Sequence, residues 1–235
     1  DAFFDTVDFV GALNDSDDWR EGWAFGYGGG EVTAPAAVAG CPSGTTSISP
    51  VDGSTTTCEV SGRITADLTL TAGNYYALSG AVFVGEDNAD SATLTIEPGV
   101  TVYGRTGDDY LVISRGSKIN ANGTKDEPIS FTSSQDVMGG TTAAGQWGGL
   151  VLLGNAPANS CGDQQGETTA EELANCGVAA EGDAGQFGGN DAEDNSGVVR
   201  YVVVKHAGKT LGNGDELNGI SFAGVGSKTK VEYIQ

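Results

Sequence analysis

From Glu59 onward, apolar and polar residues alternate in short runs. The stretches RITADLTLTAGNYYALSGAVFVG and ATLTIEPGVTVYG place apolar side chains at nearly every second position. This period is typical of a strand with one buried face. Later runs such as YLVISRG, PISFTSS, WGGLVLLGN and VVRYVVVKHAG continue the pattern, with Gly, Asn or Asp between them. The chain is therefore predicted to be all-β, with many short strands.

The spacing of the apolar runs favours a solenoid over a β-sandwich. The apolar centres Ile96, Val112, Ile129 and Leu150 lie 16 to 21 residues apart. This length suits successive coils of a parallel β-helix, each with two or three strands. Sandwich strands usually join through tight hairpin turns, whereas charged residues follow the Asn-Gly pair in INANGTKDEPISF. We expect a parallel β-helix over residues 59–235.

Two segments depart from this rhythm. Residues 1–58 mix aromatic residues with carboxylates and then become loop-like, so we interpret them as an N-terminal extension or cap. Residues 154–198 are too long for a corner and are predicted to be an insertion that leaves the solenoid. Within this insertion, Gly166–Gly177 has the pattern of one short helix, with Thr168 or Thr169 as its N-cap.

The four cysteines form two pairs that are close in sequence. Cys41 lies near Cys58, and Cys161 lies near Cys176. Zinc is disfavoured because no pair has CxxC spacing and the chain has a single histidine. Four cysteines allow three pairings, and proximity favours these two disulfides. Each would close a loop of about 15 residues and stabilise the fold by roughly 3 kcal/mol. Disulfides predict a secreted or cell-surface protein.

The formal net charge of −21 excludes a polyanion such as nucleic acid as the natural partner. No run of 18 apolar residues predicts a transmembrane helix. The excess of carboxylates has two compatible explanations. It could make the surface soluble, and some of the carboxylates could bind calcium.

Calcium is the cofactor that the acidic clusters suggest, because hard cations need several converging oxygen atoms. Clustered carboxylates also repel one another, and a cation would relieve that repulsion. Neither cluster matches the EF-hand pattern, and solvated loop charge is the alternative explanation for both. The candidate ligands are Asn14, Asp15, Asp17 and Asp18 in the first cluster and Asn190, Asp191, Glu193 and Asp194 in the second.

A catalytic site is a weaker hypothesis. Some β-helix proteins are polysaccharide lyases that use an Arg or Lys base, and VVRYVVVKHAG offers Arg200 and Lys205. Strict alternation would place these two side chains on opposite faces of the strand. His206, the sole histidine, is interpreted as structural, because no G-x-S-x-G motif accompanies it.

Aromatic residues raise the possibility of sugar binding. Trp19 and Trp23 could stack on a glycan, although aromatic residues are more often buried. Trp147 opens the run WGGLVLL and is predicted to pack in the core at the start of a coil wall rather than to hold a ligand.

Several stretches, in their order along the chain, resemble one group of proteins. They include DSATLTIEPGVTVYG, LVISRGSKINANGTKDEPISFTS, GQWGGLVLLGNAPAN and DNSGVVRYVVVKHAG. The chain is similar to secreted bacterial right-handed parallel β-helix proteins of a largely uncharacterised, cell-surface or lipoprotein-like group. The resemblance implies a right-handed solenoid and implies no particular activity.

Together these features predict a non-enzymatic extracellular structural or adhesion protein, associated with calcium. If Gln235 is the true terminus, an uncapped last coil would need cover, and a head-to-tail contact between subunits would generate a filament. The alternatives are a pectate-lyase-like, polysaccharide-active enzyme and a calcium-dependent carbohydrate-binding module, with surface glycans as the partner.

Overall fold

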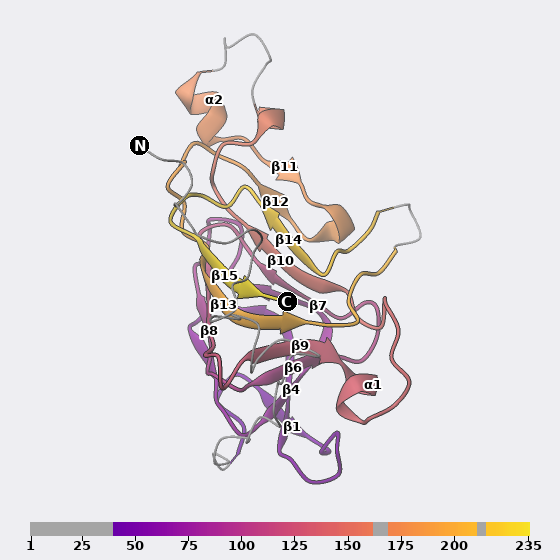
Figure 1. The fold of residues 1–235 in the computed structure, drawn as a ribbon. Coiled ribbons are helices and arrows are strands. Elements are labelled where there is room, and N and C mark those ends of the chain that lie inside the picture. Colours follow the sequence, from indigo (N-terminus) through magenta and orange to yellow (C-terminus); the bar gives the residue numbers. More distant parts are fainter. Residues whose placement is uncertain (1–39, 162–168, 211–214) are drawn as a thin grey trace, which may run out of the picture.

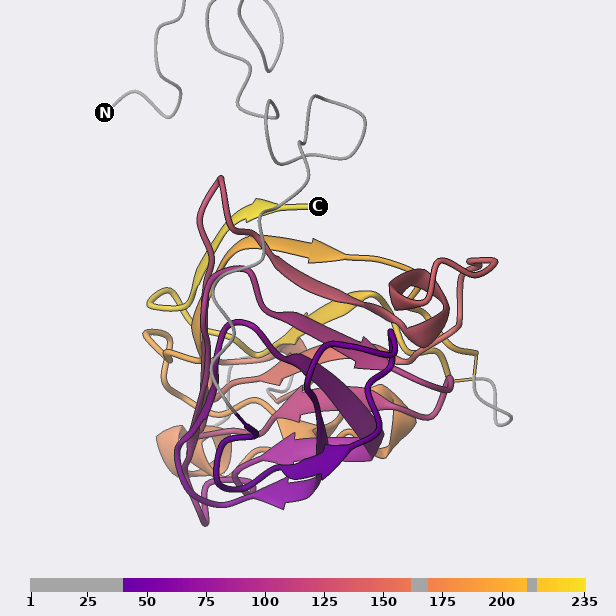
Figure 2. The ribbon, with the colours of Figure 1, turned by 90° about the horizontal axis from the view of Figure 1, so that it is seen from below.

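The computed structural model describes residues 40–161, 169–210 and 215–235. Thirteen strands join into one continuous sheet, in which every strand pair is parallel except the first, β1 with β2. The sheet winds into a right-handed parallel β-helix, as the sequence predicted. Figure 2 shows the coils stacked in chain order, from the indigo coil at one end to the yellow coil at the other.

Each coil contributes strands to three faces. The first face contains, in order, β2 (Thr57–Ile64), β4 (Tyr75–Val84), β6 (Thr101–Gly104), β9 (Ile129–Ser133) and the second half of β13 (Gly197–Val204). The second face contains the ends of β2 and β4 and then β7 (Tyr110–Ile113), β10 (Gly149–Leu153) and β14 (Ile220–Ala223). The third face contains β3 (Leu68–Leu70), β5 (Thr93–Ile96), β8 (Lys118–Asn122), the first half of β13 and β15 (Lys230–Ile234).

The remaining elements lie in the connections. β1 (Thr46–Ile48) precedes the first coil, and α1 (Ser134–Val137) follows β9. The long connection from β10 to β13 holds η1 (Asn159–Cys161), α2 (Ala170–Ala174), β11 (Val178–Ala179), η2 (Glu181–Asp183) and β12 (Gln186–Phe187). No helix in the described ranges is long and apolar enough to cross a membrane.

Stacked side chains from all three faces form the core. On the third face, Ile96 is in register with Ala121, which is in register with Val199, and all three are buried. On the first face, Tyr76, Val102 and Phe131 form an equivalent column. Burial of these columns is the main contribution to stability. Each stacked side chain removes from water its own apolar surface and that of its neighbours in the coils on either side.

The two ends of the solenoid differ. At the first coil, β1 pairs antiparallel with β2, and a disulfide joins Cys41 to the buried Cys58. At the last coil, inward positions remain partly open. Val231 is in register with the buried Val199 but is 43% exposed. The segment before β2 therefore packs against the core, while β15 exposes an apolar side chain at Val231.

Strict alternation along β13 was a wrong expectation. Tyr201 has a left-handed backbone, with φ of 47°, where the chain turns from the third face to the first. This turn shifts the phase, so that Val199 and Val202 both enter the core. Arg200 and Tyr201 consequently both lie outside the core, next to each other.

Tyr233 occupies the same corner one coil later, also with positive φ. Its ring stacks on that of Tyr201, with centroids 4.4 Å apart and planes within 3°. The guanidinium of Arg200 lies 5.1 Å and 5.4 Å from the two ring centroids. The corner is thus a small stack of rings with a cation beside them.

Trp147 packs in the core, as predicted. Its side chain is fully buried, its ring stacks near Phe131 at 6.3 Å, and its indole N–H donates to the carbonyl of Lys205 at 2.7 Å. It therefore joins the coil that contains β9 and β10 to the segment that follows β13, rather than offering a ring to a ligand.

Replacing Trp147 with Ala should lower the free energy of unfolding by about 3–5 kcal/mol, because a large cavity opens in the core. Urea unfolding followed by far-ultraviolet circular dichroism measures this loss. Trp147→Phe is the matched control, since it keeps an aromatic ring and loses the indole hydrogen bond and a smaller part of the buried volume. It should cost less than the Ala variant. Equal stability of the Ala variant and the parent would contradict the core role.

Candidate functional site: the anchored insertion and its clefts

The insertion folds back onto the outer side of the second face. Val112 and Val151 point outward from neighbouring strands there, yet both are buried. Ala184 and Phe187 of the insertion cover them and form a second, smaller apolar layer. Figure 1 shows α2 at the far end of this excursion, away from the coils. The insertion thus has an inner part, residues 176–188, that packs on the second face, and an outer part, which contains α2, that projects away from the coils.

The projecting part begins with the predicted short helix. Thr169 accepts a hydrogen bond from the backbone N–H of Glu172 at 3.2 Å, and its own N–H donates to the Glu172 carboxylate at 2.8 Å. This reciprocal pair is a capping box and confirms Thr169 as the N-cap. Thr168 lies outside the described residues. The hydrogen bonds from Thr169 lower the pKa of Glu172.

A disulfide closes the projecting part at its base. The bond joins Cys161 to Cys176, the pairing that sequence proximity predicted. Gly188 of the inner part lies directly against it, since a Cβ on this residue would come within 2.8 Å of the Cys161 sulfur. Gly188 also has φ of 100°, which favours glycine. The staple and the inner part therefore pack against each other closely.

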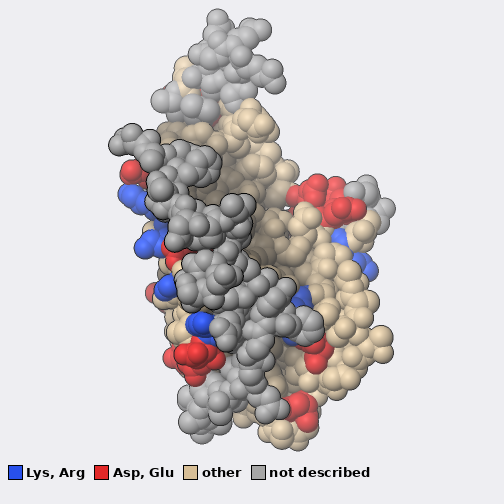
Figure 3. Space-filling view, viewed as in Figure 1, with Lys and Arg blue, Asp and Glu red and all other residues tan. Residues whose placement is uncertain are grey.

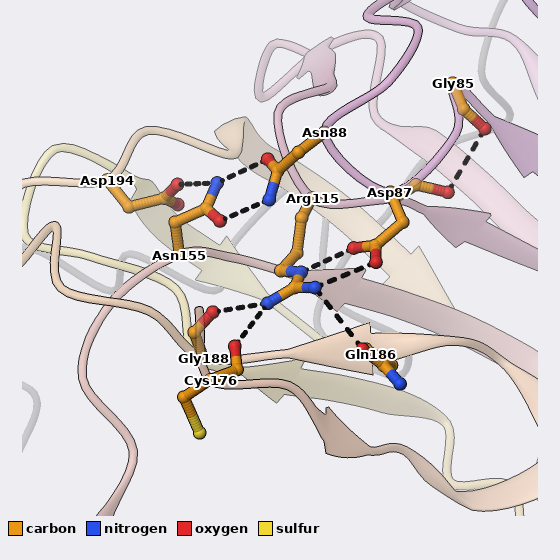
Figure 4. Close-up of polar contacts among 10 residues, drawn as sticks. Gly85, Asp87, Asn88, Arg115, Asn155, Cys176, Gln186, Gly188 and Asp194 are labelled. Carbon is orange, nitrogen blue, oxygen red and sulfur yellow. Dashed lines mark hydrogen bonds and ion pairs between the residues drawn. The ribbon is translucent and has the colours of Figure 1, made fainter. Parts of the chain in front are cut away.

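Arg115 ties the insertion to the solenoid wall. Its side chain is 8% exposed and follows the last strand residue of β7 by two positions. Nε and Nη2 donate to the two carboxylate oxygens of Asp87, at 2.5 Å and 2.8 Å. Nη1 donates to the carbonyls of Cys176 and Gly188, both at 2.7 Å. Figure 4 shows the guanidinium between these groups.

This geometry explains how a charge can be buried here. A guanidinium has five N–H donors in a plane, and Asp87 takes two of them in the bidentate arrangement that suits a carboxylate. The two carbonyls come from opposite ends of the inner part of the insertion. One buried side chain therefore joins three segments that are distant in sequence.

A second set of hydrogen bonds, between side-chain amides, lies beside the contacts of Arg115. The side-chain amides of Asn88 and Asn155 exchange hydrogen bonds at 2.9 Å and 3.0 Å, and Asn155 also donates to Asp194 at 3.4 Å. Asn88 has positive φ, which asparagine tolerates well. The corner before β5, the start of the insertion and its end are thereby linked (Figure 4).

The η2 turn is fixed against the second face of the solenoid by a side chain of β7. Gly182 and Asp183 both have left-handed backbone, with φ of 70° and 56°. The hydroxyl of Tyr110 donates to the carbonyl of Gly182 at 3.0 Å. Next to them, Ala184 is buried in the second apolar layer. The turn is thus fixed, and its two acidic residues, Glu181 and Asp183, are exposed.

Two clefts flank this turn. The first has a volume of about 200 Å³ and is lined by Arg63, Phe83 and Asp183, among others. The second has a volume of about 300 Å³ and is lined by Glu181 and Phe187 among others. Ligand pockets usually have volumes of about 300–1,000 Å³, so the second cleft is at the lower limit of that range and the first is below it. The η2 turn supplies one carboxylate to each cleft.

The second predicted calcium cluster does not converge. The Asp191 carboxylate accepts from the backbone N–H of Glu193, at 3.0 Å, and the Glu193 carboxylate pairs with Lys228 at 3.0 Å. Asp194 is buried and accepts from the Ser196 hydroxyl at 2.9 Å. Within the described ranges, no three His, Cys, Asp or Glu side chains gather in a way that could hold a metal ion.

The first cluster, residues 14–18, lies outside the described residues, as do Trp19 and Trp23. Asn190 of the second cluster is exposed. Calcium binding therefore stays a prediction for both clusters.

The two candidate catalytic bases have different partners. Arg200 lies 3.2 Å from the Glu232 carboxylate, beside the tyrosine stack. Lys205 pairs with Asp136, which follows β9, and His206 lies 3.6 Å from the same carboxylate. Arg200 and Lys205 therefore belong to separate sites.

Asp136 is the centre of the second of these sites. Burial disfavours its ionised form, but hydrogen bonds from Lys205 and Thr132 outweigh that effect and hold the pKa of this carboxyl below its usual value. The group is an ion pair with a neighbouring histidine, and all three side chains are half-buried.

Sequence reasoning missed Arg115, Asp87 and the carboxylates of the η2 turn. Arg115 is a rare cation in an acidic chain and directly follows an apolar run, which is a weak local signal. Its partners lie 28, 61 and 73 residues away along the chain. No local pattern could have identified them.

Replacing Arg115 with Met should lower stability by about 1–3 kcal/mol, because the carbonyls of Cys176 and Gly188 lose their donor while the exposed Asp87 carboxylate stays hydrated. Amide hydrogen exchange should rise most over residues 176–188, since the inner part of the insertion loses its anchor. Lys118→Met is the matched control, because Lys118 is exposed on the next strand. Equal exchange over 176–188 in both variants would contradict the anchor role.

Comparison with known proteins agrees with this architecture. The family model described as "Pectate-lyase like beta helix domain" matches residues 62–235, which is most of the chain. No curated protein and no solved structure showed a significant match. The matched range begins within β2 and includes every later coil and the insertion. The chain belongs to the pectate-lyase-like β-helix domain family.

Proposed function

We propose that this protein is a non-enzymatic extracellular or cell-surface protein that adheres to polysaccharide through the wall carrying the insertion. Membership of the pectate-lyase-like β-helix family supports a surface or polysaccharide-related role. The disulfides are compatible with an extracellular location. The observation that carries the proposal is the anchoring of an irregular, acidic insertion by the buried Arg115.

Anchoring matters because binding is weakened by the entropy lost when loops become ordered. Here a disulfide, a bidentate ion pair and an apolar layer order the inner part of the insertion before any partner arrives. The clefts beside the η2 turn are consequently formed in advance. A preformed cleft with exposed carboxylates and an aromatic wall suits recognition of hydroxyl-bearing sugars.

Calcium is part of the proposal. The predicted ligands are the oxygen donors of residues 14–18 and 190–194. Asn190 and Asp191 are exposed at the end of the insertion, whereas Glu193 pairs with Lys228 and Asp194 is buried. A cation at the second cluster would therefore contact the Asp191 carboxylate and take its further oxygen ligands from sugar hydroxyls.

A polysaccharide-active enzyme is the rival function. The observation in its favour is the group formed by Asp136, Lys205 and His206, which is half-buried and reaches solvent. A general base must lie within hydrogen-bond reach of its substrate, whereas the ammonium group of Lys205 is paired with Asp136.

A polysaccharide microarray tests the proposal. The parent chain should bind a subset of polysaccharides, more strongly with calcium than with a chelator. Arg115→Met should weaken binding at least about tenfold, because the clefts lose their fixed geometry, and Lys118→Met should leave it unchanged. Absence of binding to any polysaccharide would contradict the proposal. Release of unsaturated sugars by the parent, lost in Lys205→Ala, would establish the rival enzyme instead.

Self-association through β14 and β15 belongs to the same proposal. The exposed side chains of Val231 and Phe222 support it, because exposed apolar surface favours contact with another copy. Light scattering of the 235-residue chain should show mass rising with concentration. Val231→Lys should reduce that rise, and Val198→Lys, on the neighbouring strand, is the control. A constant monomer mass would count against assembly.

A further inference from the structure

The charge of the chain narrows the class of polysaccharide. With 32 acidic and 11 basic residues, the protein repels uronate-rich or sulfated polymers at long range and attracts cationic ones. Figure 3 shows one group of acidic side chains at the upper right, with basic side chains directly below it, and both basic and acidic side chains along the left edge. The acidic character is thus uneven over the surface.

The larger cleft has the matching local chemistry. Glu181 and Glu216 line it from opposite connections, and no Lys or Arg lines it. Both residues are exposed, and neither carboxylate has a hydrogen bond or ion pair within the described part of the chain. An occupant with positive charge would therefore gain two contacts without displacing an existing partner.

The rest of this cleft is mostly apolar. Val151, Leu217, Ala223 and Phe187 are among the residues that line it. The hydroxyl of Ser221, which also lines the cleft, adds one polar group. Such a surface suits a ring that has an apolar C–H face and polar substituents at its edge. A sugar ring that carries an ammonium group combines both properties.

The smaller cleft repeats the pattern in a weaker form. Asp183 and Glu86 line it and are exposed. Arg63 and Arg115 also line it. One nitrogen of Arg63 donates to the carbonyl of Gly85 at 2.6 Å, and Arg115 is paired with Asp87, so both cations already have partners. Since the η2 turn separates the clefts, a polymer that carries regularly spaced cations has a second site for a neighbouring unit.

From these observations we infer that the clefts beside the η2 turn bind the ammonium groups of a cationic amino-sugar polymer, with Glu181 and Glu216 as the principal contacts. This inference rests on the proposed function and adds the substrate class to it. A basic peptide would satisfy the carboxylates as well. The sugar is favoured because the chain belongs to a family with a polysaccharide-related role.

Biolayer interferometry with the intact chain tests the inference. The probes are glucosamine oligomers, the matched N-acetylglucosamine oligomers, oligogalacturonate and oligolysine. Glucosamine oligomers should bind best, and their affinity should fall as salt is raised. The double variant Glu181→Gln with Glu216→Gln should weaken binding about tenfold, the size expected for two exposed ion pairs.

The matched control is Glu171→Gln with Glu172→Gln, which removes the same charge from α2 in the same insertion. Both residues are exposed, and glutamine at position 172 preserves the capping box. The control should bind glucosamine oligomers like the parent. Thermal unfolding should be the same for both double variants, because none of the four carboxylates is buried.

Several outcomes would overturn the inference. Equal weakening in the two double variants would mean that net charge, not the cleft, determines binding. Binding of oligolysine without glucosamine oligomers would assign the clefts to a basic protein partner. Binding of neutral or uronate oligomers, with no preference for glucosamine, would leave polysaccharide adhesion intact and refute only the amino-sugar inference. If no sugar binds, both fail.

Discussion

The parallel hydrogen-bond ladder between successive coils is the constraint on which the rest of the structure depends. Because each strand pairs in register with the next, residues at equivalent positions stack directly on one another. Ile96, Ala121 and Val199 form one buried column for this reason, and Phe83, Val112 and Val151 form an outward one. The ladder therefore creates both a core inside the coils and a flat apolar strip outside them. The outer strip needs cover, and the insertion supplies it.

The insertion shows how an irregular segment can become part of a regular fold. Its apolar residues cover the strip, but a loop of this length would lose much conformational entropy on ordering. The disulfide reduces that loss in the unfolded state, and Arg115 compensates for it in the folded state by satisfying carbonyls at both ends of the inner part. The anchor is polar because the groups that need partners are backbone carbonyls, which an apolar side chain would leave unsatisfied.

Corners of the solenoid decide where charged side chains point. At Tyr201, one residue with positive φ replaces the longer turns of earlier coils and shifts the phase of β13. Arg200 consequently lies beside the Tyr201 and Tyr233 rings and Glu232, while Lys205 reaches Asp136. On the opposite side, the left-handed residues of η2 direct Glu181 and Asp183 into different clefts. Backbone conformation at single residues thus determines which charges are paired and which remain open to a partner.

The sequence by itself determined the class of fold, the coil spacing, the burial of Trp147, the disulfide pairing and the cap at Thr169. These features depend on local period, on proximity along the chain or on the chemistry of one turn, all of which a sequence displays. Only the tertiary structure decided the rest. It buried Arg115 among partners up to 73 residues away, separated the carboxylates of Asp191, Glu193 and Asp194, and brought Glu181 and Glu216 to one cleft. These contacts arise because the coils place distant segments side by side, and no local pattern encodes which corners will meet.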